Sequence, residues 1–198
     1  LLARNGIETP TMALHEHNER AVAGKLLNLL KEGRDLALVS DAGTPALSDP
    51  GAALVSRAHA AGIRVSPVPG PNAAAAAFSA AGFAADRFMF AGFLPAAKAA
   101  RAKALAALEL DCPVILYEAP HRILETVQDL AERFGPGREI AIGRELTKKF
   151  EEVVRTTLGE APAWLRADPQ RVQGEFVLVV AGGPPRSAAE LDPDRTLE

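Results

Sequence analysis

The segment Ser40-Asp-Ala-Gly-Thr-Pro-Ala-Leu-Ser-Asp-Pro-Gly51 lies between an apolar run and a helical pattern. The apolar run, at residues 35–40, predicts a buried strand. The pattern that follows, at residues 52–61, predicts a helix that Gly62 ends. A turn-rich segment between a buried strand and a helix is typical of an open α/β sheet, in which ligands bind beyond the carboxyl ends of the strands.

The same alternation extends on both sides of this segment. Upstream, residues 19–31 predict a helix with Asn18 in the capping position. Downstream, residues 63–68 predict a second strand, and a sharp Pro-Gly-Pro loop leads into an alanine-rich helix at residues 73–81. The alternation predicts a mostly parallel sheet with covering helices in this first lobe.

The pattern changes near residues 82–87, where we place a domain boundary. The elements expected beyond it are strands at residues 87–91, 113–117, 139–142, 152–158 and 175–180, and helices at residues 98–110 and 121–134. The last three strands follow one another closely, which favours antiparallel pairs in a mixed sheet. We therefore predict an α/β protein with lobes at residues 1–84 and 85–183, and a linker or tail at residues 184–198.

Composition limits the possible function. The chain has 198 residues, of which 48% are hydrophobic, so it is long and apolar enough for one large or two small folded domains. Its net charge of −3 and aromatic content of 5% argue against a protein that holds long nucleic acid by phosphate contacts alone. No apolar run approaches the roughly 20 residues of a membrane span. Cys112 is the single cysteine, which suits a reducing cytoplasm.

Two loops have the composition of a small-molecule site. In the first, Gly43 permits close approach of a ligand to the backbone, and Asp41, Thr44 and Ser48 offer polar groups. The second, Val68-Pro-Gly-Pro-Asn-Ala73, also follows a strand and precedes a helix, so the two loops should border one crevice. A plain strand-to-helix turn and a Pro-Gly turn with an asparagine cap are the alternatives, and neither needs a ligand. The glycine fingerprint of dinucleotide-binding proteins is absent.

Two later segments concentrate reactive side chains. Tyr117-Glu-Ala-Pro-His-Arg122 places a phenol, a carboxylate, an imidazole and a guanidinium where a strand meets a helix. Gly143-Arg-Glu-Leu-Thr-Lys-Lys-Phe-Glu-Glu152 contains Arg144, Lys148 and Lys149, which could contact phosphate. Solvated residues of a first helical turn and a solvated charged face are the respective alternatives.

The segment His15-Glu-His-Asn-Glu19 has a histidine spacing that can hold a metal ion. The sequence offers no obvious third ligand, so we expect no metal site. A segment that contacts RNA or starts a helix is the preferred interpretation.

Five of these segments occur in a specific order: Asp-Ala-Gly-Thr-Pro-Ala-Leu-Ser-Asp-Pro-Gly, Val-Pro-Gly-Pro-Asn-Ala, Tyr-Glu-Ala-Pro-His-Arg, Arg-Glu-Leu-Thr-Lys-Lys-Phe-Glu-Glu and Gly-Glu-Phe-Val-Leu-Val-Val. Each alone is weak, but the five in order resemble the tetrapyrrole-methylase superfamily, or class III methyltransferases, over about residues 1–183. The leading His-Glu-His-Asn-Glu segment resembles the branch that acts on small-subunit ribosomal RNA.

This resemblance implies two α/β lobes, with S-adenosylmethionine folded in the cleft between them. It implies a cytoplasmic homodimer that methylates the 2′-hydroxyl of a cytidine in 16S ribosomal RNA, within the small ribosomal subunit. Gly43-Thr-Pro45 stands where relatives that modify tetrapyrroles carry Gly-Asp-Pro. The alternatives are a methyltransferase of the same fold acting on a tetrapyrrole or other small molecule, and a non-catalytic ribosome-binding module.

The resemblance also suggests roles for single residues. The cofactor would be bound by Asp41, Ala42, Gly43, Thr44, Pro45, Leu47, Asn72, Ala73, Tyr117 and Glu175. Candidates for the general base, or for positioning the hydroxyl group, are Glu118, His121, Glu145 and Lys148. The RNA substrate would be contacted by His15, His17, Arg122, Arg144 and Lys149. Methyl transfer is an in-line displacement from a sulfonium, which requires no metal ion.

The sequence departs from the family pattern at its start. The pattern normally opens with a strand and a Thr-Pro-Ile-Gly-Asn-Leu loop, followed by a Glu-Asp-Thr-Arg segment, and the sequence given begins at Leu1 without either. We therefore expect that the natural beginning is missing. Those parts help to form the cleft in the family, so the chain as given is expected to be incomplete as an enzyme.

Overall fold

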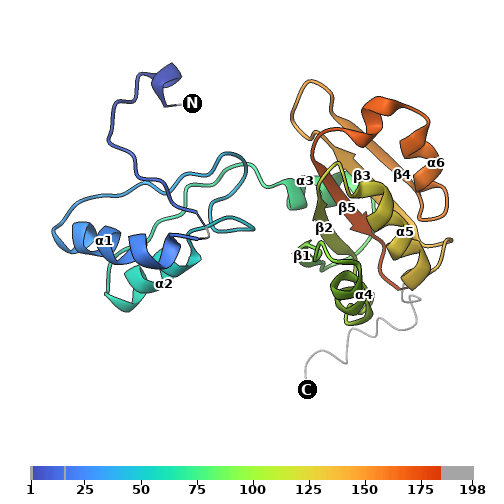
Figure 1. Cartoon of the computed structure of the whole chain (residues 1–198), viewed down its shortest axis with the longest axis horizontal. Coiled ribbons are helices and arrows are strands. Elements are labelled where there is room, and N and C mark those ends of the chain that lie inside the picture. The colour runs from blue at the N-terminus through green and yellow to red at the C-terminus, as the bar shows by residue number, and fades with distance from the viewer. Residues whose placement is uncertain (1, 16, 184–198) are drawn as a thin grey trace. The chain divides into compact units, whose positions relative to one another are not determined.

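The structure, a computed structural model, describes residues 2–15 and 17–183 and is of the α/β class that we predicted (Figure 1). It divides into two compact units, residues 1–71 and 72–198. This division precedes the boundary that we expected near residue 84, because helix α3 (Ala73–Ala81) packs on the sheet of the second unit. The predicted tail at residues 184–198 lies outside the described residues.

The first unit contains helices α1 (Glu19–Lys31) and α2 (Ala52–Ala60), as predicted, and a 3-10 turn η1 (Ala3–Asn5). The two α-helices pack together and bury small and medium apolar side chains: Ala23, Leu54 and Ala58. No helix within the described residues is both long and apolar enough to span a membrane.

The capping of α1 differs from the prediction. Asn18 occupies the N-cap position, but its side chain accepts a hydrogen bond from the backbone N–H of His15 at 2.8 Å and donates to the carbonyl of Ala13 at 3.1 Å. The carboxamide therefore closes the turn before the helix instead of capping the helix itself.

The two strands predicted at residues 35–40 and 63–68 are not formed. Val39 and Val68 remain 66% and 91% exposed. A strand requires a neighbour to pair its backbone groups, and neither segment has one among the described residues. The apolar composition predicted burial at these positions, but it carries no information on whether a neighbouring strand is present to pair with them.

The second unit is built on a five-stranded mixed sheet (Figure 1). Its strands are β1 (Met89–Phe93), β2 (Val114–Glu118), β3 (Glu139–Arg144), β4 (Glu152–Thr157) and β5 (Phe176–Val180). Their order in the sheet is β1-β2-β5-β3-β4. β1 and β2 are parallel and the other neighbours are antiparallel, which confirms the antiparallel pairs that we predicted.

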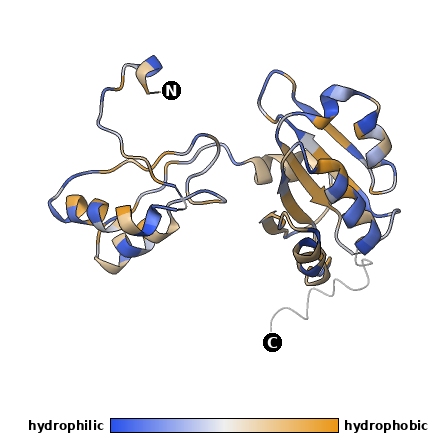
Figure 2. Cartoon of the chain, viewed as in Figure 1, coloured by the Kyte–Doolittle hydropathy of each residue, from blue (hydrophilic) through white to orange (hydrophobic). Residues whose placement is uncertain are grey.

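Alternating side chains of β5 form cores on both faces of the sheet. Leu178 and Val180 pack with residues of α4 (Lys98–Ala106), α5 (Ile123–Phe134) and α6 (Ala161–Arg166). Val177 and Val179 pack against the alanines of α3 on the other face. The strands accordingly stand out as the most hydrophobic part of this unit (Figure 2).

Two short helices, α6 and the 3-10 turn η2 (Pro169–Val172), escaped the sequence analysis, and α4 ends before the residue 110 that we predicted. Short helices carry too few residues for a clear periodic pattern.

The register of the sheet brings the ends of all five strands level with one another along one edge of the sheet, at the carboxyl ends of β2 and β3. Phe176, the first residue of β5, is paired with both Glu118 and Arg144, the last residues of β2 and β3. Arg144 is in turn paired with Glu152, and Tyr117 with Phe93. The loops that carry the predicted catalytic residues therefore leave the sheet at the same edge.

Candidate functional site

The loop at residues 41–51 has an unusual backbone. Gly43 and Gly51 have φ values of 75° and 135°, and the non-glycine residues Ala46 and Ser48 also lie in the left-handed region, with φ values of 65° and 58°. Such conformations cost energy in residues that carry a Cβ atom and cluster at functional sites. The strained backbone is thus compatible with the predicted ligand-binding loop, which stays a prediction.

The two predicted cofactor loops meet within the first unit. The hydroxyl of Thr44 donates a hydrogen bond of 3.1 Å to the carbonyl of Pro71, and the hydroxyl of Ser40 donates to the carbonyls of Ala42 and Gly43. Directly after Pro71, the side chain of Asn72 accepts from the N–H of Ala75 at 3.0 Å and caps α3, as predicted.

The backbone of the first loop is open to a ligand. A Cβ atom built at Gly43 would meet no heavy atom within 4 Å, and residues 41–44 are exposed. Pro45 and Leu47 are half-buried beneath this exposed stretch. The loop thus fits the close approach of a cofactor that the sequence predicted.

The far end of this loop is held by a residue that the sequence analysis missed. The carboxylate of Glu19, in the first turn of α1, accepts hydrogen bonds of 2.9 Å from the backbone N–H groups of Gly51 and Ala53. It therefore caps α2 from another helix. Sequence spacing gave no indication of this contact, because 32 residues separate Glu19 from Gly51.

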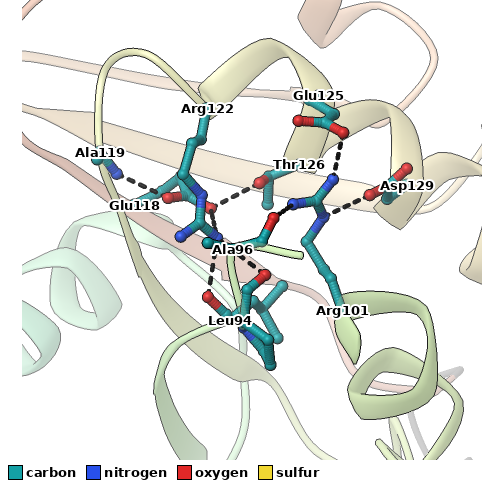
Figure 3. Close-up of polar contacts among 10 residues, drawn as sticks. Leu94, Ala96, Arg101, Glu118, Ala119, Arg122, Glu125, Thr126 and Asp129 are labelled. Carbon is teal, nitrogen blue, oxygen red and sulfur yellow. Dashed lines mark hydrogen bonds and ion pairs between the residues drawn. The ribbon is translucent and has the colours of Figure 1, made fainter. Parts of the chain in front are cut away.

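At the end of β2, Glu118 is buried within a hydrogen-bond network (Figure 3). One carboxylate oxygen accepts from the N–H of Ala119 at 2.8 Å, and the other accepts from the hydroxyl of Thr126 at 2.6 Å and from Arg122 at 3.2 Å. Both oxygens are occupied, so this geometry gives Glu118 a structural role. Its predicted catalytic role stays a prediction.

Two guanidinium groups hold the loop that follows β1 (Figure 3). Arg122 donates to the carbonyl of Leu94 at 2.8 Å and more weakly to that of Pro95 at 3.4 Å. Arg101, which is fully buried, donates to the next carbonyl, that of Ala96, at 3.0 Å. Three successive carbonyl groups are thus fixed by positive charge, and Arg122, which we expected to contact RNA, is engaged within the protein.

The charge of Arg101 is balanced inside the protein. Its guanidinium lies 2.5 Å from the carboxylate of Asp129 and 2.5 Å from that of Glu125, both on α5 (Figure 3). Burying a charge without such partners would cost several kcal/mol. Sequence analysis missed this residue because a charged side chain in an amphipathic helix is normally assigned to the solvent face.

The remaining residues of this strand end differ in their exposure. The half-buried ring of Tyr117 packs edge-to-face with Phe90 and Phe93, with ring centroids 4.9 Å and 5.6 Å apart. His121 is exposed, and no hydrogen bond of its imidazole is recorded within the described residues. Of the chemical groups in this turn, the imidazole is therefore the one that remains available to a substrate.

In the loop between β3 and β4, Lys148 is bound by two carboxylates. Its ammonium group donates to Glu145 and to Glu175, each at 2.9 Å. The ammonium lowers the pKa of the Glu145 carboxyl, and Glu145, followed by Glu175, raises the pKa of Lys148. A lysine held in its charged form cannot accept a proton at neutral pH, so this geometry opposes Lys148 as the general base.

The close packing of this loop also requires a glycine. A Cβ atom at Gly174, where φ is 87°, would lie 2.5 Å from the side chain of Glu145. The N–H of Glu175 donates to the Glu145 carboxylate at 2.8 Å. Glu145 and Glu175 are therefore joined to each other as well as to Lys148, whereas Glu175 was expected to bind the cofactor.

Arg144 and Lys149, both predicted to contact the substrate, lie in different environments. Arg144 is 5% exposed, and its guanidinium donates to the carbonyls of Gln173 at 2.8 Å and Phe150 at 3.0 Å. Lys149 is exposed, with its ammonium 5.3 Å from the centre of the Phe150 ring. Lys149 is thus available to phosphate in this conformation, whereas Arg144 is not.

The two histidines of the leading segment are exposed. The rings of His15 and His17 lie 6.1 Å apart in an edge-to-face arrangement. Both belong to the first unit, whereas the other predicted substrate residues belong to the second.

Comparison with known proteins adds independent information. Residues 3–162 match the family model of the tetrapyrrole (corrin/porphyrin) methylases. The chain is 50% identical over 178 residues to "Ribosomal RNA small subunit methyltransferase I" of Pseudomonas aeruginosa, covering 89% of this chain and 63% of that protein. It is 48% identical over 198 residues to the protein of the same name from Xylella fastidiosa, covering 100% of this chain and 72% of that protein. The chain thus spans about two thirds of the length of these relatives.

A solved structure shares the fold. The methyltransferase CobJ superposes with a TM-score of 0.60 at 24% identity, covering 83% of this chain and 72% of that one. The α/β methylase fold that we expected is confirmed.

Replacing Glu118 with Gln should destabilise the protein, because the half-buried Arg122 loses its negatively charged partner and an amide NH2 replaces one of the two acceptor oxygens that Ala119 and Thr126 use. The free energy of unfolding, measured with urea, should fall by about 3 kcal/mol. As a control, Asp111→Asn breaks the exposed Arg87–Asp111 pair and should cost less than about 1 kcal/mol. Equal losses in the two variants would contradict the structural role of Glu118.

Replacing Lys148 with Met should raise the pKa of Glu145 toward its ordinary value. The lowered pKa means that Glu145 stabilises the fold fully above its ordinary pKa, and that this stabilisation is lost as the pH falls through the lowered value. Carbon-13 NMR titration of the carboxyl group measures the change directly. Lys149→Met serves as the control and should leave Glu145 unaffected; an unchanged titration in both variants would refute the pairing.

Proposed function

Because this chain belongs to the tetrapyrrole methylase family, and within it groups with the ribosomal RNA small subunit methyltransferase I proteins, we propose that the complete protein methylates small-subunit ribosomal RNA. The methyl group comes from S-adenosylmethionine, and the acceptor is the 2′-hydroxyl of a cytidine in 16S ribosomal RNA. The observation that carries this proposal is the 48% identity that extends along all 198 residues.

The cofactor is held mainly by the loop at residues 41–47. Gly43 offers an open backbone, and Thr44 ties this loop to the Pro71 carbonyl, directly before Asn72 and Ala73. When bound, S-adenosylmethionine supplies a methyl group on a sulfonium, which needs no further activation. Tyr117 and Glu175 are further cofactor contacts in this proposal, although Glu175 also pairs with Lys148.

The protein must still assist loss of the ribose hydroxyl proton, since a hydroxyl is a poor nucleophile at neutral pH. We assign this task to His121 among the four candidates. Glu118 is buried with both oxygens bonded, and Glu145 and Lys148 neutralise each other. His121 is exposed in the turn that follows β2, which leaves the sheet at the same end as the loop that carries Glu145 and Lys148.

RNA recognition requires local rather than overall charge, since the net charge is −3. In the β3–β4 loop Lys148 pairs with two carboxylates, which leaves the exposed Lys149 for phosphate, and His15 and His17 are exposed in the first unit. The proposal includes a homodimer, as the family resemblance implies, and a cytoplasmic location, where the ribosomal substrate is found. Sedimentation of the full-length protein tests the homodimer.

Transfer of a radiolabelled methyl group tests the function. The full-length protein is incubated with intact small ribosomal subunits that lack the modification, with naked ribosomal RNA, or with a precorrin. Label should enter the subunits, at a ribose hydroxyl of a cytidine. Transfer to the precorrin alone would favour a tetrapyrrole methylase, and failure to bind S-adenosylhomocysteine would favour a non-catalytic ribosome-binding module.

Gly43→Ala in the full-length protein should weaken S-adenosylhomocysteine binding about tenfold, as measured by calorimetry. The added Cβ atom meets no protein atom, so the loss comes from backbone strain in the loop and from contact with the ligand. Gly33→Ala is a matched control, because Gly33 has a similar φ of 83°, equally open surroundings, and lies outside the loop. Undiminished affinity in Gly43→Ala would place the cofactor elsewhere.

His121→Gln should lower the rate of methyl transfer at saturating cofactor by roughly a hundredfold, the usual scale for losing a general base. S-Adenosylhomocysteine affinity should not change. Gln128→Ala, an exposed substitution on α5, which begins two residues after His121, controls for effects on that helix. A His121→Gln enzyme with the wild-type rate would remove His121 from the mechanism.

A further inference from the structure

We propose that Phe150 is a stacking platform for an unpaired base of the RNA substrate, and that the hollow beside it selects a base carrying an amino group. This inference rests on the proposed function and adds a binding site to it. The ligand is a nucleobase close to the methylated nucleotide, because the hollow lies along the sheet edge that carries His121.

Phe150 is 61% exposed in a chain with few aromatic residues. It borders an open hollow of about 390 Å³, whose lining also includes Arg144, Glu151, Glu152, Asp168 and Gln170. Exposing a phenyl ring costs hydrophobic free energy, and stacking with a base recovers it.

The loop that carries Phe150 is held in a fixed conformation. The buried Arg144 donates to the carbonyl of Phe150 at 3.0 Å and to that of Gln173 at 2.8 Å. The carboxylate of Glu151 accepts from the N–H of Thr147 at 2.5 Å, and Thr147 has a left-handed φ of 67°. The backbone beneath the ring is thus anchored, which lowers the entropy lost when a base binds.

The polar lining of the hollow suits a base rather than a phosphate. Glu151, Glu152 and Asp168 bring three carboxylates, against the single positive charge of Arg144 in the lining. Phosphate would be repelled, whereas carboxylates accept hydrogen bonds from the amino group of cytosine or adenine. Internal partners such as Arg171, which donates to Glu152, use only part of the acceptor capacity of these carboxylates.

The neighbouring cation completes the site. The ammonium of Lys149 lies 5.3 Å from the centre of the Phe150 ring. It stands next to the hollow rather than in its lining, where it can contact the phosphate of a nucleotide whose base is stacked on the ring.

The position of the hollow relates it to the proposed catalytic turn. Glu118 at the end of β2 is paired with Phe176, Phe176 with Arg144, and Arg144 with Glu152. Three strand spacings, about 14 Å, therefore separate the turn from the hollow along the sheet edge. This separation suits a nucleotide near the reacting one rather than the reacting one itself.

Binding of the full-length protein to intact small ribosomal subunits tests the inference. Phe150→Ala should weaken binding about tenfold or more at constant salt, with a matching rise in KM for subunits. Phe150→Trp should retain wild-type binding, because an indole also stacks on bases. In both variants S-adenosylhomocysteine affinity and thermal stability should stay at the wild-type values. A role of Phe150 in folding alone would instead lower both.

Phe88→Ala is the matched control, since Phe88 is 40% exposed and directly precedes β1. β1 is the outer strand on the side of the sheet opposite to β4, which borders the hollow. Wild-type subunit binding by Phe150→Ala would overturn the inference. So would an equal loss in Phe88→Ala, or a change of oligomeric state in Phe150→Ala without a change in RNA binding. Subunit binding thus decides the role of Phe150, whereas methyl transfer by the wild type decides the proposed function.

Discussion

The register of β5 is the constraint on which the rest of the second unit depends. All five residues of this strand are buried, and it pairs with β2 on one side and β3 on the other. A slip of one residue would exchange Leu178 and Val177 between the two cores, so burial on both faces fixes the register strongly. Glu118 and Arg144 both pair with Phe176, and a loop follows each of them. The burial that fixes the register of β5 therefore also sets the spacing between these two loops.

The charged residues near the sheet edge fall into two groups. Arg101, Arg122 and Arg144 point inward and donate to backbone carbonyls of the surrounding loops. A guanidinium presents several donors in a fixed plane, so one side chain can hold two segments of irregular backbone at once. Lys149 and His121 point outward and remain available. Loops that lack regular hydrogen bonding thus gain rigidity from buried charge, while a few exposed groups are left for chemistry.

The sequence predicted the elements of the second unit well, because the strands and helices there have strong patterns and find partners within the same unit. The segments at residues 35–40 and 63–68 had equally apolar patterns but find no pairing strand in the part of the chain that the structure describes. An apolar pattern does not indicate whether a neighbouring strand exists. Motifs selected candidate loops, such as residues 117–122, but could not separate Glu118, which is buried, from His121, which is exposed. That distinction depends on Thr126 and on the Leu94 carbonyl, which come from other elements. Arg101 escaped notice because a charged helix residue is normally assigned to the solvent face, and its partners Glu125 and Asp129 lie on another helix.

The capping of α2 by Glu19 ties two distant parts of the first unit to one carboxylate. The contact spans two backbone N–H groups, so its geometry depends on the length of the glutamate side chain. An aspartate would be one methylene shorter. Both N–H groups donate to the same carboxylate oxygen, so a glutamine could accept both bonds but would lack the negative charge that favours a helix N-terminus. Divergence at position 19 is therefore coupled to the loop 32 residues away, and a relative that changes one should carry a compensating change in the other.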